Sequence, residues 1–149
     1  MRCPVCQQAG PLELHGSAEV TVGTVAVALE RRPVVACPQD HQATPREVVS
    51  SAMAAVEELI PQARSRLLRR DACHACGAGL TMPVRRTERP VTVEAEGERG
   101  VLTLVFDLPS SRCPECGADQ VPSRSQEDLV VAVPALFARP PADPAVGDG

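Results

Sequence analysis

Cys73-His74-Ala75-Cys76 and Cys113-Pro114-Glu115-Cys116 are the stretches of sequence that decide the fold. Both are C-x2-C pairs, a spacing at which one tight backbone turn presents two thiolates to the same metal ion. Two such pairs supply four thiolates, which complete the tetrahedral shell of a structural zinc ion. The second half of the chain therefore predicts a zinc site made of four cysteines, with iron in the same shell as the chemical alternative.

The first half of the chain repeats the pattern with one cysteine fewer. Cys3 and Cys6 form a third C-x2-C pair, and Cys37 stands where a fourth pair would begin. His41, four residues after Cys37, is the predicted fourth ligand, because imidazole suits three thiolates better than a carboxylate does. The alternatives for this position are two other side chains, His15 and Asp40.

The predicted ligands fill two sites and leave no cysteine over. We expect two structural zinc ions held by eight side chains: Cys3, Cys6, Cys37, His41, Cys73, Cys76, Cys113 and Cys116. A cross-braced arrangement is the alternative, in which the pairs at 3–6 and 73–76 hold one ion together. The repetition of the complete unit along the chain favours two sites that follow one another instead.

Alternating apolar residues lie between the ligand pairs in both halves. Alternation of period two is typical of half-buried β-strands, and Gly23-Thr24 between two such runs predicts a hairpin turn. The expected strands are residues 12–14, 20–22, 25–29, 34–36, 82–86, 91–94 and 101–106, with a turn at 95–100. Strands enclosed by two metal-binding turns are typical of a zinc ribbon. The sequence thus predicts a small zinc-binding α+β fold of two tandem zinc ribbons, each followed by a helix.

The helix after the first ribbon has a clear start signal. In Thr44-Pro45-Arg46-Glu47 the threonine can cap the helix, the proline suits its first turn and the glutamate completes a capping box. Apolar residues then follow at helical spacing as far as Ile60, and Pro61 should end or kink the helix. We expect a second helical piece over residues 62–70.

A second helix is expected from Ser123 or Ser125 to Phe137, with Pro134 limiting its length. The proline-rich end lacks apolar anchors, which predicts a disordered tail. The chain is thereby divided into a first zinc ribbon, a helical linker, a second zinc ribbon, a C-terminal helix and a tail: residues 1–43, 44–70, 71–122, 123–137 and 138–149.

Each half of the chain has few residues with which to build a core. The 149 residues include two phenylalanines and no tryptophan or tyrosine. A domain of roughly 60 residues buries only about 60% of the surface that its unfolded chain exposes, and a structural metal is a common way to stabilise so small a core. We therefore expect metal-dependent folding, since zinc binding contributes on the order of 10–16 kcal/mol in small zinc fingers.

The sequence also predicts a cellular context. No apolar run approaches the roughly 20 residues needed to span a bilayer, and Met1-Arg2 leads into the first cysteine pair without a signal peptide. Cysteines in C-x2-C pairs are typical of metal binding rather than of a disulfide framework. We expect a cytoplasmic protein without membrane contact. The basic residues are all arginine, which together with abundant Ala, Val and Pro indicates a GC-rich bacterial genome.

No catalytic motif accompanies the predicted metal sites. The sequence has neither an H-x-E nor an H-E-x-x-H arrangement, and it shows no glycine-rich phosphate-binding loop, no nucleophile elbow and no evident small-molecule site. A shell closed by four protein ligands leaves no position at which zinc could activate water. We therefore predict a protein that is not an enzyme.

The arginines gather in one cluster near the middle of the chain: Arg64, Arg66, Arg69 and Arg70. On a helix, Arg66, Arg69 and Arg70 would share a face that could contact phosphates or an acidic partner, although a solvated linker helix is the simpler interpretation. The net charge of −4 argues against an extended nucleic-acid surface, and base-stacking aromatic residues are few. Nucleic-acid binding by a transcription or translation accessory module is therefore the second hypothesis.

Cys-Pro-Val-Cys, alternating strands, Pro-x3-Cys, a second metal-binding turn and a helix follow one another over residues 3–60. A similar series recurs over residues 73–137. This order resembles the zinc-binding N-terminal domain of MqsA-type antitoxins. The resemblance implies structural zinc, ligands at the seven cysteine positions and a surface that binds a partner toxin. In that family a separate helix-turn-helix domain binds DNA, whereas this chain has two predicted zinc domains and no room for that domain.

The leading hypothesis is a non-enzymatic zinc protein that serves as a scaffold for binding another protein. Strand edges could add a strand to a partner, and an apolar helix face could dock in a groove. Antitoxin-like or immunity-like neutralisation is a narrower form of this hypothesis.

Overall fold

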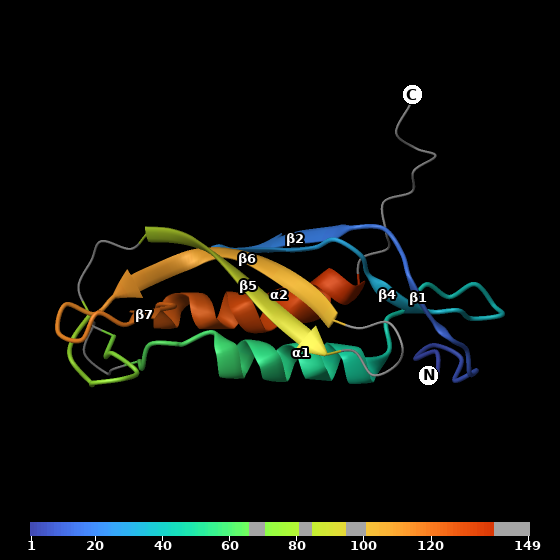
Figure 1. Ribbon diagram of the computed structural model, residues 1–149, viewed down its shortest axis with the longest axis horizontal. Helices are drawn as coiled ribbons and strands as arrows, with labels where there is room; N and C mark the ends of the chain where they lie inside the picture. Colours follow the sequence, from blue (N-terminus) through green and yellow to red (C-terminus); the bar gives the residue numbers. More distant parts are fainter. Residues whose placement is uncertain (66–70, 81–84, 95–100, 139–149) are drawn as a thin grey trace, which may run out of the picture.

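The structure is a computed structural model that describes residues 1–65, 71–80, 85–94 and 101–138. Within these ranges the elements follow in the order β1 (Leu12–Leu14), β2 (Ala18–Val22), β3 (Val25–Leu29), β4 (Pro33–Val35), α1 (Arg46–Leu59), β5 (Arg85–Glu94), β6 (Val101–Arg112), β7 (Asp119–Gln120), a 3-10 turn (Ser123–Ser125) and α2 (Gln126–Ala138). They form a small α+β fold with two antiparallel sheets and two helices. The larger sheet has the order β2-β3-β6-β5, with β7 paired to the end of β6, and the smaller one pairs β1 with β4 (Figure 1).

Strands from both halves of the chain form the larger sheet. The hairpin β2–β3 meets the hairpin made by β5 and β6, because β3 pairs with β6 and places Val27 opposite Phe106. The predicted turn between β2 and β3 is confirmed, and Gly23 adopts a positive φ of 54° there. Strands expected in two separate ribbons therefore lie side by side in one sheet, and the tandem-ribbon organisation itself stays a prediction.

The two helices pack on the larger sheet in a crossed manner. The helix α1, which follows the first half's strands, packs on β5 of the second half, while α2 packs on β2 and β3 of the first half. The helices also contact each other and lie side by side in Figure 1. Each half therefore covers apolar strands that belong to the other half.

This crossing creates a large hydrophobic core to which both halves contribute, instead of the separate thin core expected in each half. A second, smaller cluster contains Ala63, Cys73, Leu80 and Cys113. Phe106 is fully buried in the sheet and belongs to the large cluster, which draws on the strands β2, β3, β5 and β6 and on both helices. The most deeply buried members include Val25, Val27, Val48, Ala52, Val91, Leu104, Leu108, Leu129, Val133 and Leu136. None of the metal-ligand candidates is part of this cluster.

The start of α1 differs from the prediction. The Thr44 hydroxyl donates a hydrogen bond of 2.7 Å to the carbonyl of Pro33 and makes no capping bond to the helix. Thr44 is buried, and its hydroxyl is used by the carbonyl of Pro33, the first residue of β4. The helix therefore begins at Arg46, with Pro45 in the capping position, and the predicted capping box is not formed.

The ends of the two helices also differ from expectation. Residues 62–65 are not helical, because Gln62 bridges to Val121 and Arg64 bridges to Ala72; residues 66–70 of the predicted piece lie outside the described residues. Helix α2 ends at Ala138, one residue after the predicted end at Phe137, and Pro134 lies inside it. The predicted tail beyond Ala138 also lies outside the described residues.

Among the strands, predictions and structure agree closely at residues 12–14 and 25–29. The strand expected at 34–36 is shifted to Pro33–Val35, and β6 continues past residue 106 to Arg112. The strand expected at 82–86 is described only at 85–86, within β5, and the turn expected at 95–100 lies outside the described residues.

Polar side chains fix both ends of α2 to the first half. At its C-terminus, the buried guanidinium of Arg32 donates to the carbonyls of Phe137 at 2.7 Å and Gln42 at 2.9 Å. Burial lowers the pKa of Arg32, and a cation beside a helix C-terminus is favourable. At the N-terminus, the Asp128 carboxylate accepts the Thr24 backbone N–H at 3.0 Å, and this bond lowers the pKa of Asp128.

Candidate metal centres

Two clusters of four side chains have the spacing of metal ligands: Cys3, Cys6, Cys37 and His41 in one, Cys73, Cys76, Cys113 and Cys116 in the other. In each cluster the four ligand atoms lie within 4.8 Å of one another. The segments that carry the clusters lie at opposite ends of the molecule, near β1 and β4 at one end and near β7 at the other (Figure 1). The structure therefore has two groups that are compatible with two metal ions.

The ligand pairs join in sequence order rather than as a cross-brace. The pair at Cys3 and Cys6 meets Cys37 and His41, and the pair at Cys73 and Cys76 meets the pair at 113–116. We refer to these groups as the first centre and the second centre. Of the described residues, no further group of three or more Cys, His, Asp or Glu side chains has this spacing.

The second centre has nearly regular geometry. The Sγ atoms of Cys73 and Cys116 are 3.6 Å apart, and those of Cys76 and Cys113 are 3.5 Å apart. A tetrahedral ion with Zn–S bonds of about 2.3 Å would place its sulfur atoms roughly 3.8 Å from one another. The four thiolates are therefore spaced closely enough to bind one ion without rearrangement of the backbone.

Two matching turns position these thiolates. After Cys73, the N–H of Gly77 donates to the Cys73 carbonyl at 2.9 Å; after Cys113, Gly117 donates to the Cys113 carbonyl at the same distance. Gly77 and Gly117 have φ values of 78° and 76°, a conformation that glycine adopts without a steric cost. The turns expose backbone N–H groups to the sulfurs, such as Ala75 N–H, which lies 3.4 Å from Cys73 Sγ.

A buried glutamine supports the second centre, and the sequence analysis did not identify it. The Gln120 Nε2 group donates to Cys73 Sγ at 3.4 Å, and Oε1 accepts the His74 backbone N–H at 2.7 Å. His74 Nδ1 lies 2.9 Å from the same oxygen, so this histidine is held beside the turn and is not part of the ligand cluster. Only the position of Gln120 in β7, four residues after Cys116, could have suggested this contact.

Hydrogen bonding divides the thiols of the second centre into two kinds. The backbone N–H of Cys76, followed by the Gln120 side chain, lowers the pKa of Cys73 to about 5. Although the Ala78 N–H lowers the pKa of Cys76, the neighbouring sulfurs and burial together raise it to about 12. Before metal binds, Cys73 is therefore a thiolate at neutral pH and Cys76 a thiol, and an ion that binds all four sulfurs must displace protons.

The first centre is completed by His41 through its Nδ1 atom. This atom lies 3.7 Å from Cys3 Sγ and 3.6 Å from Cys37 Sγ, while the Sγ atoms of Cys6 and Cys37 are 3.3 Å apart. Bonds of about 2.3 Å to sulfur and about 2.0 Å to nitrogen would give a nitrogen–sulfur separation of roughly 3.6 Å. The geometry therefore fits a shell of three thiolates and one imidazole.

The two alternative ligands lie outside this cluster. His15 is placed with its Nε2 atom 3.4 Å from a Glu13 carboxylate oxygen, and Asp40 is not grouped with the cysteines. The turn after Cys37 explains the difference, because the Asp40 N–H bonds to the Cys37 carbonyl one residue earlier than in the other turns. Asp40 itself has a positive φ of 64°, and the following residue supplies the ligand atom.

The arginine cluster is described only in part. Arg64 is exposed, and its Nη2 atom lies 3.5 Å from the His74 carbonyl near the second centre. Arg66, Arg69 and Arg70 lie outside the described residues, so the face that they would share is not placed. The helix on which this face was expected does not include Arg64.

No helix within the described ranges has the length and apolar character needed to cross a membrane. We found no match to this chain among protein-family models, curated proteins or solved structures.

Proposed function

We propose that the protein is a non-enzymatic zinc-binding scaffold that holds a surface for another protein. In this proposal both ions are structural zinc, and the turns that hold them complete the two predicted zinc ribbons. The observation that carries it is the complete donor set of each cluster, four ligand atoms within 4.8 Å. Such a shell leaves no coordination position for water or substrate, which is typical of structural rather than catalytic zinc.

The helices supply a surface for the partner. Val130 on α2 is 54% exposed, and Leu59 at the end of α1 is 48% exposed. Exposed apolar patches are typical of protein–protein contacts. A metal centre at each end of the molecule would hold this layer in a fixed shape (Figure 1).

A reducing compartment such as the cytoplasm suits this proposal, because none of the seven cysteines forms a disulfide and all of them lie in the two clusters. Antitoxin-like or immunity-like neutralisation is a narrower form of the same function. It is supported by the resemblance in the order of motifs and not by the fold of the described residues.

Purification of the tagged full chain tests the proposal. We expect two zinc ions per chain by inductively coupled plasma mass spectrometry and one protein partner at a fixed ratio, with a complex that can be rebuilt from purified components. Iron in place of zinc would contradict the assignment of the metal. Salt-sensitive binding to DNA or RNA that is lost in Arg66→Glu with Arg70→Glu, without a protein partner, would replace the proposal by the nucleic-acid hypothesis.

A further inference from the structure

A groove runs between α1 and α2 on the outer side of the helix layer. It consists of two hollows of about 560 and 500 Å³. The first lies between Glu57 and Leu129, near the start of α2, and the second lies between Arg46 and Phe137, near its end. Val49 and Ser50 line both hollows, so the two form one continuous depression along the antiparallel helices.

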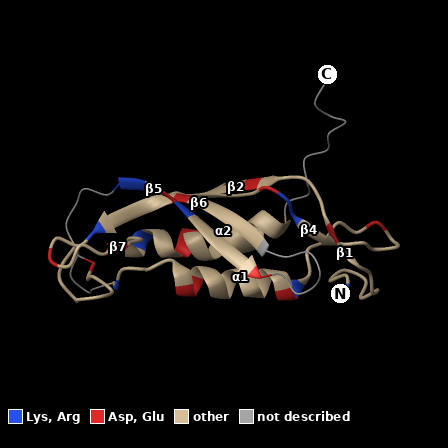
Figure 2. Cartoon of the chain, viewed as in Figure 1, with Lys and Arg blue, Asp and Glu red and all other residues tan. Residues whose placement is uncertain are grey.

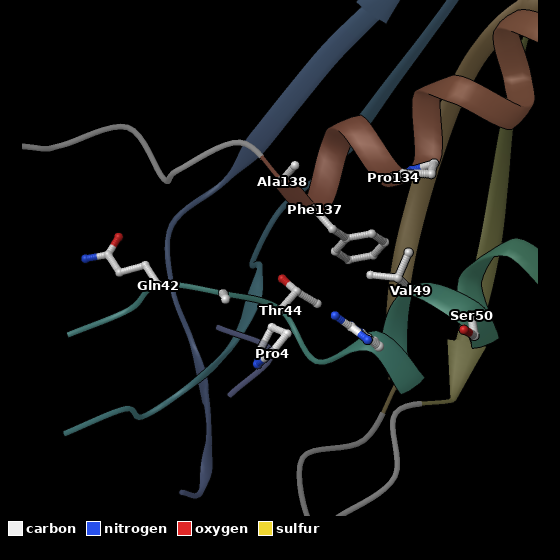
Figure 3. A pocket seen from close by; sticks show the side chains of 10 residues that line it. Pro4, Gln42, Thr44, Val49, Ser50, Pro134, Phe137 and Ala138 are labelled. Carbon is white, nitrogen blue, oxygen red and sulfur yellow. The ribbon is translucent and has the colours of Figure 1, made fainter. Parts of the chain in front are cut away.

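The lining of this groove is largely apolar. Val56, Leu129 and Phe137 are buried, while Val49 and Met53 are half-buried. Val130 and Pro134 on α2 are exposed beside it. Figure 3 shows that Phe137 and Pro134 come from one helix and Val49 and Ser50 from the other, with Thr44 and Pro4 at the end near the first centre. A third helix laid along this depression would cover apolar surface that water now contacts.

The charges of the two helices are mostly negative. Their ionisable residues are one arginine and five carboxylates: Arg46, Glu47, Glu57, Glu58, Glu127 and Asp128. Glu57 lines the hollow beside the start of α2, the end of the helix that carries Glu127, whereas Arg46 lies at the opposite end (Figure 2). The groove therefore has one carboxylate, Glu57, in the hollow next to the second centre and one basic residue, Arg46, in the hollow next to the first.

Glu57 is the polar group that a partner would contact at this end of the groove. It is the carboxylate that lines the hollow beside the start of α2. A partner with N–H donors, such as arginine or lysine side chains, would bond to it.

We propose that the groove binds a basic amphipathic helix of a partner protein, which lies beside α1 and α2 as a third helix. This inference rests on the proposed protein-binding function and names the partner's chemistry. A second copy of this chain fits less well, because its own helix layer would bring like charges together. Helix α1 spans 14 residues, or about 21 Å. The partner segment is therefore a helix of about four turns, apolar at i, i+4, i+7 and i+11, with arginine or lysine towards Glu57.

Two adjacent valines provide a matched pair of variants for the test. Val130 lines the groove and Val131 does not, although both are about half exposed. We would pan phage-displayed helical peptides of about 14 residues against the zinc-loaded full chain and measure a fluorescein-labelled copy of the best binder by anisotropy. We expect enriched peptides to be basic and amphipathic. Val130→Lys should weaken binding about tenfold or more, and Val131→Lys less than about twofold.

Several outcomes would overturn the inference. They are the absence of enrichment, the enrichment of acidic or non-amphipathic peptides, and peptide binding that Val130→Lys leaves unchanged. A concentration-dependent dimer that Val130→Lys abolishes would assign the groove to a second copy. Zinc content and the melting temperature of both variants establish that they fold. A native protein partner that still binds Val130→Lys would overturn the groove as its binding site and leave the proposed scaffold function standing. Peptide binding at the groove without a native protein partner would overturn the scaffold function and leave the groove as a peptide-binding site.

Discussion

The first and second centres each bring four ligand atoms together, but they do so with different local structure. The second centre uses two matching turns, each with a glycine at positive φ, and four cysteines. The first centre uses one such turn, with Gln7 in the place of glycine, and one tighter turn that brings in His41. The ligand spacing nevertheless falls within the same limit. The position of the ligand atoms is thus more strictly maintained than the turns that carry them.

Removal of metal should give the largest effect, because it should unfold the two centres and leave the hydrophobic core folded. Because no ligand candidate belongs to the large hydrophobic cluster, we expect chelation to open the turns at both ends while β3 and β6 stay protected. Hydrogen exchange should rise by more than about tenfold at residues 3–8, 73–78 and 113–118. Re-addition of zinc should restore the protection. Collapse of the far-UV circular dichroism signal on chelation would instead support the expectation that the whole fold depends on metal.

Loss of the histidine should change the first centre alone. His41→Ala removes one of four ligands and leaves three thiolates with an open position. We expect the metal content to fall from two ions towards one, as measured by elemental analysis after dialysis against a weak chelator. His15→Ala is the matched control and should retain both ions. Full metal content in His41→Ala would remove this side chain from the ligand set.

Gln120→Ala should weaken the second centre and move its acid sensitivity. The Gln120 side chain is among the groups that lower the pKa of Cys73 to about 5, so its loss should raise that pKa. A thiolate with a lowered pKa binds metal above that pKa and loses it as the pH falls. Zinc release from the second centre should therefore begin at a higher pH in the variant. The zinc affinity of this centre should fall by up to about 10-fold.

A titration with a chromogenic zinc indicator measures this release. Gln39→Ala is the control, because only the backbone of Gln39 contacts a thiolate, at 3.4 Å from Cys37 Sγ. An unchanged release pH in Gln120→Ala would show that the backbone N–H groups alone hold Cys73 as a thiolate.

Substitutions at the positive-φ residues of the turns should give the smallest effects. They should lower the free energy of unfolding in the second centre and raise it in the first. Gly77→Ala meets no neighbouring atom within 4 Å, so its cost is the positive φ alone, about 1 kcal/mol of unfolding free energy. Gln7→Gly should gain up to about 1 kcal/mol by removing the strain at φ 65°. Urea unfolding of the zinc-loaded proteins measures both. Equal signs for the two substitutions would mean that the turns are not equivalent.

Sequence reasoning was most successful where the signal is local. The C-x2-C spacing and the period-two alternation identified the ligand clusters and most of the described strands, because turns and pleats depend on neighbouring residues. The structure groups His41, and not Asp40, with the three cysteines. The prediction of His41 was argued from ligand chemistry. In the structure, His41 reaches the cluster because the turn after Cys37 is one residue tighter than the other turns.

The features that were missed depend on contacts between distant segments. No local pattern predicts that β3 pairs with β6, or that each helix packs on the other half's strands. Thr44 has the sequence of a cap, but the carbonyl of Pro33 competes for its hydroxyl. Gln120 carries no motif, and it contacts Cys73 only because β7 folds back beside the Cys73 turn.

The crossed helices also bear on how the chain folds as it is synthesised. The apolar faces of β2 and β3 are covered by α2, the last element of the described chain. An emerging N-terminal half can bind its own metal, but its strands stay uncovered until Phe137 has left the ribosome. Contacts of such long sequence separation are slow to form. The first centre is therefore expected to assemble early as an isolated metal-bound loop, and to become part of a folded protein only after α2 has been synthesised.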